Sequence, residues 1–340
     1  MTGVTDLLEY AAARGAFGLL GRIPGGVAGR LGAGLGGLAY ALRARRAVVL
    51  RQIAAAFPGA DRARVEEIAE ASYRHFGRET AEIARLQRTG TRELPDRVST
   101  DAAADAWIER MRAGEGALIV TGHVGNWEVS GAMLAARGVP LAAVVKRQSN
   151  ARFDRWLADA RRRLGIEPVY MEEAIRVVPR LLRAGRSVAL VADQDARSHG
   201  VIVTFLGRPA STFRGPARLA LATGAPLVFG ASVREDDGYR VRMETVREGG
   251  VEAGGRAARS DRDVERALTR GWVERLEAHV RRFPEQYFWF HRRWKSGDRN
   301  EPRADAVSRA GSGSMGRIRS ERTRSEGDGT DMNRDDGSNR

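Results

Sequence analysis

The chain has 340 residues, of which 42% are hydrophobic, so it can bury a sizeable core in one or two domains. It contains no cysteine, which excludes a disulfide framework, a thiolate nucleophile and a cysteine-based metal cluster. Its net charge of +14 at pH 7 indicates an anionic partner, which could be an acidic membrane leaflet, a phosphorylated lipid, an acidic carrier protein or nucleic acid.

The positive charge lies on the body of the chain and is carried almost entirely by arginine. Residues 303–340 hold 8 arginines and 7 acidic residues and contribute little of it, and Lys146 and Lys295 are the only lysines. An arginine-rich sequence also fits a biased genome composition, so charge alone does not identify the partner.

The N-terminal region is apolar but broken by arginines. The uncharged run at 31–42 is shorter than the roughly 20 apolar residues that a spanning helix needs. We therefore expect residues 1–46 to form a membrane-associating helical segment that lies in the interface, with arginines reaching toward anionic headgroups. The alternative is a helix packed on the protein's own core. A secretory signal is disfavoured, because Asp6 and Glu9 come early and no basic segment precedes the apolar run.

The spacing of apolar residues predicts the next helix. Val65, Ile68 and Phe76 recur at helical intervals after Asp61, which can cap the first turn. We expect an amphipathic helix over 61–76.

The segment Gly122-His-Val-Gly-Asn-Trp-Glu128 carries the most chemistry. It follows a short apolar strand at 117–121 and opens a helix at 127–137, with Asn126 as its N-cap. His123 then lies in the loop and Glu128 in the first helical turn, where the two side chains can converge. An imidazole oriented by a carboxylate can take a proton from a hydroxyl near neutral pH, so the spacing predicts a general base. A loop histidine and a glutamate placed by the helix dipole alone remain the alternative.

Strands and helices alternate through the rest of the chain. Apolar strands are expected at 141–145, 187–192 and 226–232, and a strand with one wet face at 239–246. Helices are expected after Asn150, near Arg218 and over 264–280. This rhythm predicts an α/β fold with a central, largely parallel sheet flanked by helices, and one catalytic domain over 47–300. Residues 301–340 have no aromatic side chain and are expected to be a disordered tail.

The histidines show no metal-binding spacing. His75, His123, His199, His279 and His291 are scattered. We therefore predict no metal and no cofactor, and we expect the four histidines other than His123 to be surface or satisfied core residues.

The sequence blocks together resemble one enzyme family. The segment 122–128 resembles the H-x4-D/E signature of glycerolipid acyltransferases, in the form used by the late acyltransferases of lipid A biosynthesis, the lauroyl and myristoyl transferase family. Five further blocks follow in the family's order, at 146–161, 191–195, 205–212, 215–226 and 284–295. The likeness runs from about residue 20 to 297.

The resemblance implies a set of site residues. It assigns catalysis to His123 and Glu128, with Glu128 orienting the imidazole. It assigns substrate binding to Arg147, Asn150, Asp154, Arg161, Asp193, Gln194, Thr212 and Gly215. The residues themselves leave other readings open, because Asp193 could pair with Arg161 as structure and Arg147 could form a surface ion pair instead of holding a phosphate.

The resemblance also implies a reaction. Acyl carrier protein or acyl-CoA would donate a fatty acyl chain to a hydroxyl of a lipid A precursor at the cytoplasmic face of the inner membrane, with the protein peripheral or anchored by its N-terminus. Backbone amides near Gly125 and a nearby arginine are candidates to stabilise the oxyanion.

Several other functions stay open at this point. The acceptor could be a phosphatidylinositol mannoside or another glycolipid, and the chain could be a basic membrane-binding protein without activity. Nucleic acid is not expected as a partner, because the aromatic residues at 287–294 fit a core and belt better than a base-stacking platform. An esterase is disfavoured because no Gly-x-Ser-x-Gly motif occurs.

Overall fold

The computed structural model of the chain describes residues 2–250 and 261–296. The tail predicted at 301–340 lies outside these residues.

A seven-stranded sheet forms the centre of the fold, in the order β1-β9-β8-β2-β5-β3-β4. Its strands are β1 (Val98–Thr100), β2 (Leu118–Thr121), β3 (Leu141–Val145), β4 (Ile166–Tyr170), β5 (Ser187–Val191), β8 (Leu227–Glu235) and β9 (Gly238–Arg247). All neighbouring strands are parallel except β8 and β9, which form an antiparallel hairpin. The largely parallel α/β fold expected from the sequence is confirmed.

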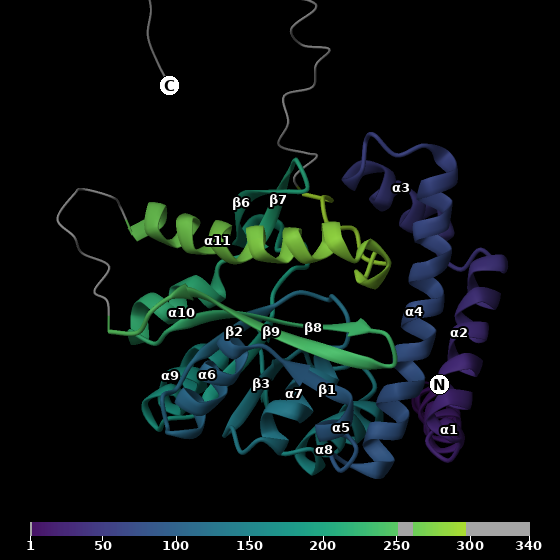
Figure 1. Cartoon of the computed structure of the whole chain (residues 1–340), viewed down its shortest axis with the longest axis horizontal. Coiled ribbons are helices and arrows are strands. Elements are labelled where there is room, and N and C mark those ends of the chain that lie inside the picture. The colour runs from purple at the N-terminus through teal and green to yellow at the C-terminus, as the bar shows by residue number, and fades with distance from the viewer. Residues whose placement is uncertain (1, 251–260, 297–340) are drawn as a thin grey trace, which may run out of the picture. The chain divides into compact units, whose positions relative to one another are not determined.

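Helices cover both faces of this sheet, and the inner strands carry apolar residues toward both faces. In β2, Leu118 and Val120 belong to one hydrophobic core and Ile119 to the other. The first core is covered by α9 (Ala174–Arg183), α10 (Gly215–Thr223) and α11 (Asp261–Arg282), and the second by α6 (Ala102–Arg112) and α7 (Trp127–Ala136). Figure 1 shows α11 lying along one side of the sheet.

The remaining elements lie around the sheet. They are α1 (Thr2–Leu20), α2 (Gly25–Ala41), α3 (Arg46–Ala56), α4 (Arg62–Thr89), α5 (Leu94–Arg97), α8 (Ala151–Arg163), the short 3-10 helices η1 (Arg197–His199) and η2 (Pro284–Gln286), and the separate hairpin of β6 (Gly200–Phe205) and β7 (Arg208–Phe213). Asp61 caps α4 as predicted, since its side chain accepts from the Arg64 amide at 2.8 Å.

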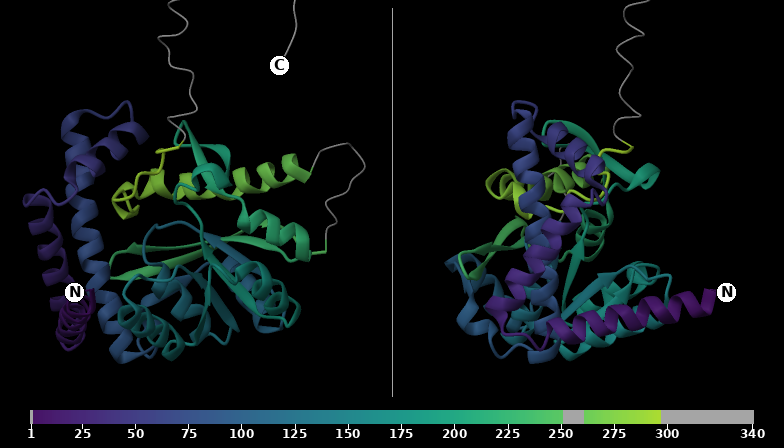
Figure 2. Two further views of the ribbon diagram at one scale, coloured as in Figure 1. Left: turned by 180° about the vertical axis from the view of Figure 1, so that it is seen from behind. Right: turned by 90° about the vertical axis from the view of Figure 1, so that its right-hand side faces the viewer.

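The N-terminal segment packs on the protein through small residues. Helix α2 runs beside α4 (Figures 1 and 2), and the two backbones approach so closely that a Cβ on Gly36 would lie 2.0 Å from the Tyr73 carbonyl oxygen. The opposite face of α2 exposes apolar side chains, among them Leu31, Leu35 and Leu38. Within the described residues no helix combines the length and apolarity that crossing a membrane requires.

Candidate active site

His123 lies in the loop between β2 and α7, at the carboxyl end of the central strands. The loop turns at Gly125, which has φ +61°, and a Cβ there would lie 1.8 Å from the Ser232 carbonyl oxygen. Only glycine fits both the conformation and the space. The predicted N-cap is confirmed, because the Asn126 side chain accepts from the Val129 amide at 3.1 Å. The loop is thus held in one shape between a buried strand and a capped helix.

Asp193 is the carboxylate that contacts the imidazole. Strand β5 lies next to β2, with Val191 opposite Thr121, so the segment after β5 emerges beside the His123 loop. Asp193 Oδ1 lies 2.6 Å from His123 Nδ1, and Oδ2 accepts from the His123 backbone amide at 2.9 Å. Both oxygens of this completely buried carboxylate are therefore directed at the same residue.

The pair fixes the protonation pattern of the imidazole. Complete burial by itself would raise the pKa of Asp193, but the neighbouring His123, through its charge and hydrogen bonds, holds that pKa well below the usual range of a carboxyl. An ionised carboxylate can only accept, so Nδ1 must carry a proton, and in the neutral imidazole the lone pair is therefore on Nε2. The His123 side chain is 18% exposed, and the described residues offer Nε2 no hydrogen-bond partner.

Glu128 does not take the place that the sequence suggested. Its carboxylate binds Arg161 of α8, with Arg161 Nη2 at 2.5 Å and Nε at 3.1 Å from Oε1. The expectation that Glu128 orients His123 is corrected, because Asp193 occupies Nδ1. The alternative pairing of Arg161 with Asp193 is also wrong. The first turn of α7 directs Glu128 toward α8, whereas the parallel pairing of β2 and β5 brings Asp193 to the imidazole.

A second histidine lies close to the first. The ring of His291 lies 6.1 Å from that of His123, and Phe288 and Trp127 also face the His123 ring, at 5.7 and 4.8 Å between centroids. Burial lowers the pKa of His291 to about 4, although Asp193 acts to raise it, so this imidazole is neutral at pH 7. Residue spacing did not predict this position, although His291 belongs to the block at 284–295.

Arg293, from the same sequence block as His291, binds the side chain of Thr212. The Arg293 guanidinium is 1% exposed and donates to Thr212 Oγ1 at 2.6 Å and to the Ser211 carbonyl at 2.8 Å. Tyr287 is buried beside Asp193 and Arg293, and burial raises the pKa of its hydroxyl well above the usual range. These contacts support the wall of the site around Asp193. Thr212, predicted to bind substrate, is completely buried and takes part in this support.

The other predicted binding residues lie on α8 and on nearby loops. Asn150 caps α8 and donates to the Asp6 carbonyl of α1 at 2.8 Å, while Asp154 accepts from the Tyr170 hydroxyl at 2.7 Å. Arg147 is half exposed and stacks over the Tyr170 ring at 3.7 Å, with Asp154 3.8 Å away. Gln194 is exposed beside Asp193, and Gly215 begins α10. Asn150 and Asp154 therefore have structural partners in the described residues.

A family match agrees with this arrangement. The model of the bacterial lipid A biosynthesis acyltransferases matches residues 7–296. The chain belongs to this family.

Named relatives of this acyltransferase come from mycobacteria. A phosphatidylinositol mannoside acyltransferase of Mycolicibacterium smegmatis is 28% identical over 238 residues, which cover 69% of the chain and 73% of the relative. A protein of the same name from Mycobacterium tuberculosis is 33% identical over 165 residues, which cover 46% of the chain and 52% of the relative. The chain thus matches about half to three-quarters of the length of these relatives.

The backbone amides of the acyltransferase loop are already occupied. The amide of Val124 donates to Gly122, that of Gly125 to Gln286 and that of Asn126 to Ser232, at 2.8 to 2.9 Å. The amides of residues 124–126 are therefore not free to stabilise an oxyanion, because each of these donors has an acceptor within the fold.

Proposed function

We propose that this acyltransferase moves a fatty acyl chain from a thioester donor to a hydroxyl of a glycolipid, with His123 as general base. The observation that carries the proposal is the contact between His123 Nδ1 and the buried Asp193, which leaves Nε2 as a proton acceptor at the carboxyl end of β2. Open α/β sheets build their sites at this end of their strands.

The reaction follows from the state of the imidazole. Nε2 takes the proton of the acceptor hydroxyl as its oxygen attacks the thioester carbonyl, and Asp193 stabilises the imidazolium that forms. The tetrahedral intermediate then collapses, the carbon–sulfur bond breaks, and the imidazolium returns the proton to the departing thiolate. The products are an ester and a free thiol, and no acyl-enzyme is required.

The oxyanion of the intermediate needs donors, and Arg161 is the one that the site supports best. Glu128 holds its Nε and Nη2, while Nη1 has no partner among the described residues. The N–H groups of Trp127 and Glu128 also lack an acceptor in the described fold, because they open α7 ahead of the amide that Asn126 caps. Glu128 thereby contributes by fixing an arginine rather than by touching the base.

A phosphatidylinositol mannoside is the acceptor that the relatives favour, since both named relatives are phosphatidylinositol mannoside acyltransferases. A lipid A precursor is the second candidate, and it is favoured by the description of the family. Either an acyl carrier protein or acyl-CoA would present the thioester, and both donors are anionic, which suits a chain of net charge +14.

We further propose that the protein binds the cytoplasmic face of an anionic inner membrane through α1 and α2. Exposed apolar side chains lie on both helices, with Leu8 and Leu19 each 64% exposed on α1 and Leu35 58% exposed on α2. Arg30 and Arg43 are exposed on or next to α2. Apolar side chains beside arginines are typical of helices that lie in the membrane interface.

The test is transfer of a labelled acyl chain by the purified protein, with products identified by mass spectrometry. We expect an ester on a phosphatidylinositol mannoside from acyl-CoA or acyl carrier protein, and its near-complete loss, about 100-fold or more, in His123→Ala. Circular dichroism of the variant should match the wild type. Transfer only to a lipid A precursor would select the second acceptor, and a His123→Ala protein with most of its activity would overturn the base assignment.

A further inference from the structure

A buried carboxylate outside the catalytic pair lies directly beneath the His123 loop. Glu79 of α4 is 2% exposed, although a charge inside a protein is costly unless it is paired and hydrogen-bonded. Its Oε1 accepts from Arg234 Nε at 2.6 Å, and its Oε2 accepts from the Tyr239 hydroxyl at 2.5 Å and from Asn126 Nδ2 at 2.6 Å. Three donors from three separate segments therefore converge on one side chain.

Glu79 stays ionised in this setting. Burial alone would raise its pKa, but the charge of the Arg234 guanidinium and the hydrogen bonds from Arg234 and Tyr239 lower it overall. Burial raises the pKa of Tyr239, so its hydroxyl keeps the proton that it donates. An ionised carboxylate can only accept hydrogen bonds. Asn126 must therefore turn its NH2 group toward Glu79.

This orientation decides whether Asn126 can cap α7. With the NH2 group on Glu79, the amide oxygen faces the Val129 amide, which it accepts at 3.1 Å. The reverse orientation would place the amide oxygen against a carboxylate and leave the Val129 amide without its cap. Asn126 lies between His123 and Glu128 in the chain, so the cap fixes the start of the helix that carries Glu128 and the end of the loop that carries His123.

The same network holds the loop from a second side. The Gln286 side chain donates to the Arg234 carbonyl and accepts from the Arg234 amide, both at 2.8 Å. The Gln286 carbonyl accepts from the Gly125 amide at 2.9 Å. Glu79 thus contacts Asn126 directly and reaches Gly125 through Arg234 and Gln286.

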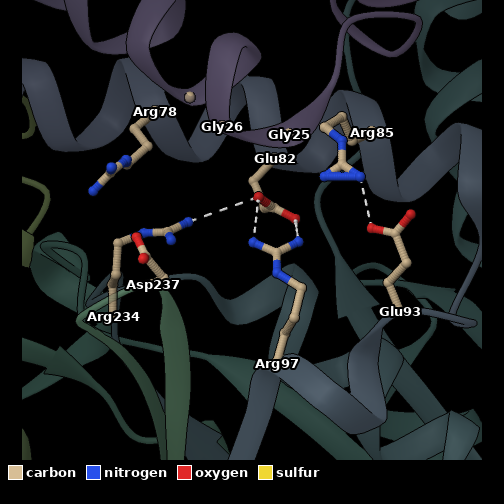
Figure 3. Close-up of a pocket in the computed structure, with 10 residues that line it drawn as sticks. Gly25, Gly26, Arg78, Glu82, Arg85, Glu93, Arg97, Arg234 and Asp237 are labelled. Atoms are coloured by element: carbon tan, nitrogen blue, oxygen red, sulfur yellow. Dashed lines mark hydrogen bonds and ion pairs between the residues drawn. The ribbon is translucent and has the colours of Figure 1, made fainter.

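A second carboxylate, Glu82, also lies close to Arg234 and helps to hold its guanidinium in place. Figure 3 shows Arg234 beside Glu82, which Arg97 binds through both oxygens, around a cavity of about 310 Å³. Arg85 on the same cavity wall binds Glu93 at 2.6 Å. Most of the guanidinium groups around this cavity are paired with a carboxylate. We therefore interpret these ion pairs as contacts that join α4, α5 and β8.

We propose that Glu79 is a positioning residue for acyl transfer: its carboxylate fixes the orientation of the Asn126 side chain and, through it, the His123 loop and the first turn of α7. The proposal rests on the proposed function for its effect on turnover. Glu79 itself touches neither His123 nor, in this proposal, the reacting groups.

The test compares Glu79→Gln with Glu82→Gln. Both carboxylates are buried on α4 and bound to arginine, but the described contacts of Glu82 do not include Asn126. We expect Glu79→Gln to lower kcat about tenfold or more with KM within about threefold, because a small displacement of a base is costly. Glu82→Gln should keep kcat within about threefold of the wild-type value. Its Tm should fall by about as much as the Tm of Glu79→Gln, since both variants remove a buried charge. Equal kcat values for both variants would overturn the proposal.

Two further measurements separate positioning from a general loss of structure. In an Asn126→Ser background, where a serine caps α7 without help from Glu79, Glu79→Gln should change kcat less than threefold. Amide hydrogen exchange at Val129 needs no substrate and should quicken in Glu79→Gln but not in Glu82→Gln. Unchanged exchange at Val129 in both variants would refute the positioning role of Glu79. If exchange quickens in Glu79→Gln as expected but the wild-type protein shows no transferase activity, the positioning role stands and the proposed function is refuted.

Discussion

Asp193 directs both of its carboxylate oxygens at His123, one at the Nδ1 atom and one at the backbone amide, at 2.6 and 2.9 Å. The second contact fixes the position of the residue, and the first fixes the tautomer of its ring. The base is therefore oriented by a residue just after β5, 70 residues further along the chain. Removal of the Asp193 charge should therefore change the tautomer of His123 while leaving the imidazole in place.

Asp193→Asn should lower kcat by about 10²- to 10⁴-fold with a much smaller change in KM. The amide can donate to Nδ1, which would move the proton to Nε2 and leave no lone pair for the acceptor hydroxyl. Steady-state kinetics with the best acceptor would measure both constants. A variant that keeps more than half of the wild-type kcat would show that the carboxylate is not needed to set the tautomer.

Glu128→Gln and Arg161→Lys should lower kcat/KM by similar factors, and the double variant should be little worse than either. The reason is that Glu128 acts by holding the Arg161 guanidinium through several hydrogen bonds, which neither replacement can reproduce. A double-mutant cycle on kcat/KM measures this coupling. Additive losses would mean that the two residues act independently and that Glu128 has a separate contact with the reaction.

The sequence predicted the elements that carry the site because their signals are local. The apolar run before Gly122 became β2, and Asn126 caps α7 as expected. The partner of the imidazole was mistaken because the spacing from His123 to Glu128 suggested a local pair, while the contact with Asp193 depends on which strands lie side by side. Strand order is set by the whole fold, and periodicity does not encode it.

Two elements that the sequence did not predict, β4 and α9, each contain a proline. Pro168 lies within β4, where it is tolerated because β4 is the last strand of the sheet. Pro179 lies inside α9, a helix whose apolar face still packs on the core through Val178 and Leu182. In both cases tertiary packing outweighs a residue that locally disfavours the element.

The stability of the protein should fall between pH 6.5 and 4 because of His75. Burial lowers the pKa of His75 from the ordinary 6.5 to about 4, although Glu79, 3.8 Å from Nδ1, acts to raise it. Below pH 6.5 the unfolded chain binds a proton that the folded protein excludes, so unfolding becomes more favourable as the pH falls, by up to about 1.4 kcal/mol per pH unit. Stability is retained above pH 6.5.

His75→Gln should remove this contribution, so its free energy of unfolding should change less steeply over the same range. Urea denaturation at several pH values measures the two slopes. His291, whose pKa is also lowered to about 4, remains in both proteins and contributes equally. Parallel slopes for the wild type and the variant would contradict the buried neutral state of His75.

Replacement of Leu31, Leu35 and Leu38 by serine should weaken binding to anionic vesicles about tenfold or more without changing the fold. These side chains are 48%, 58% and 53% exposed on the outer face of α2, so serine removes little internal packing while it removes apolar area that the membrane would bury. Vesicle flotation with and without anionic lipid measures the change, and higher salt should weaken the binding further.

The matched control is Ile175→Ser, since Ile175 is 85% exposed on α9, on the other side of the fold from α2 (Figure 1). Equal losses in both variants would indicate nonspecific apolar binding, and unchanged binding of the α2 variant would exclude this face as the membrane surface.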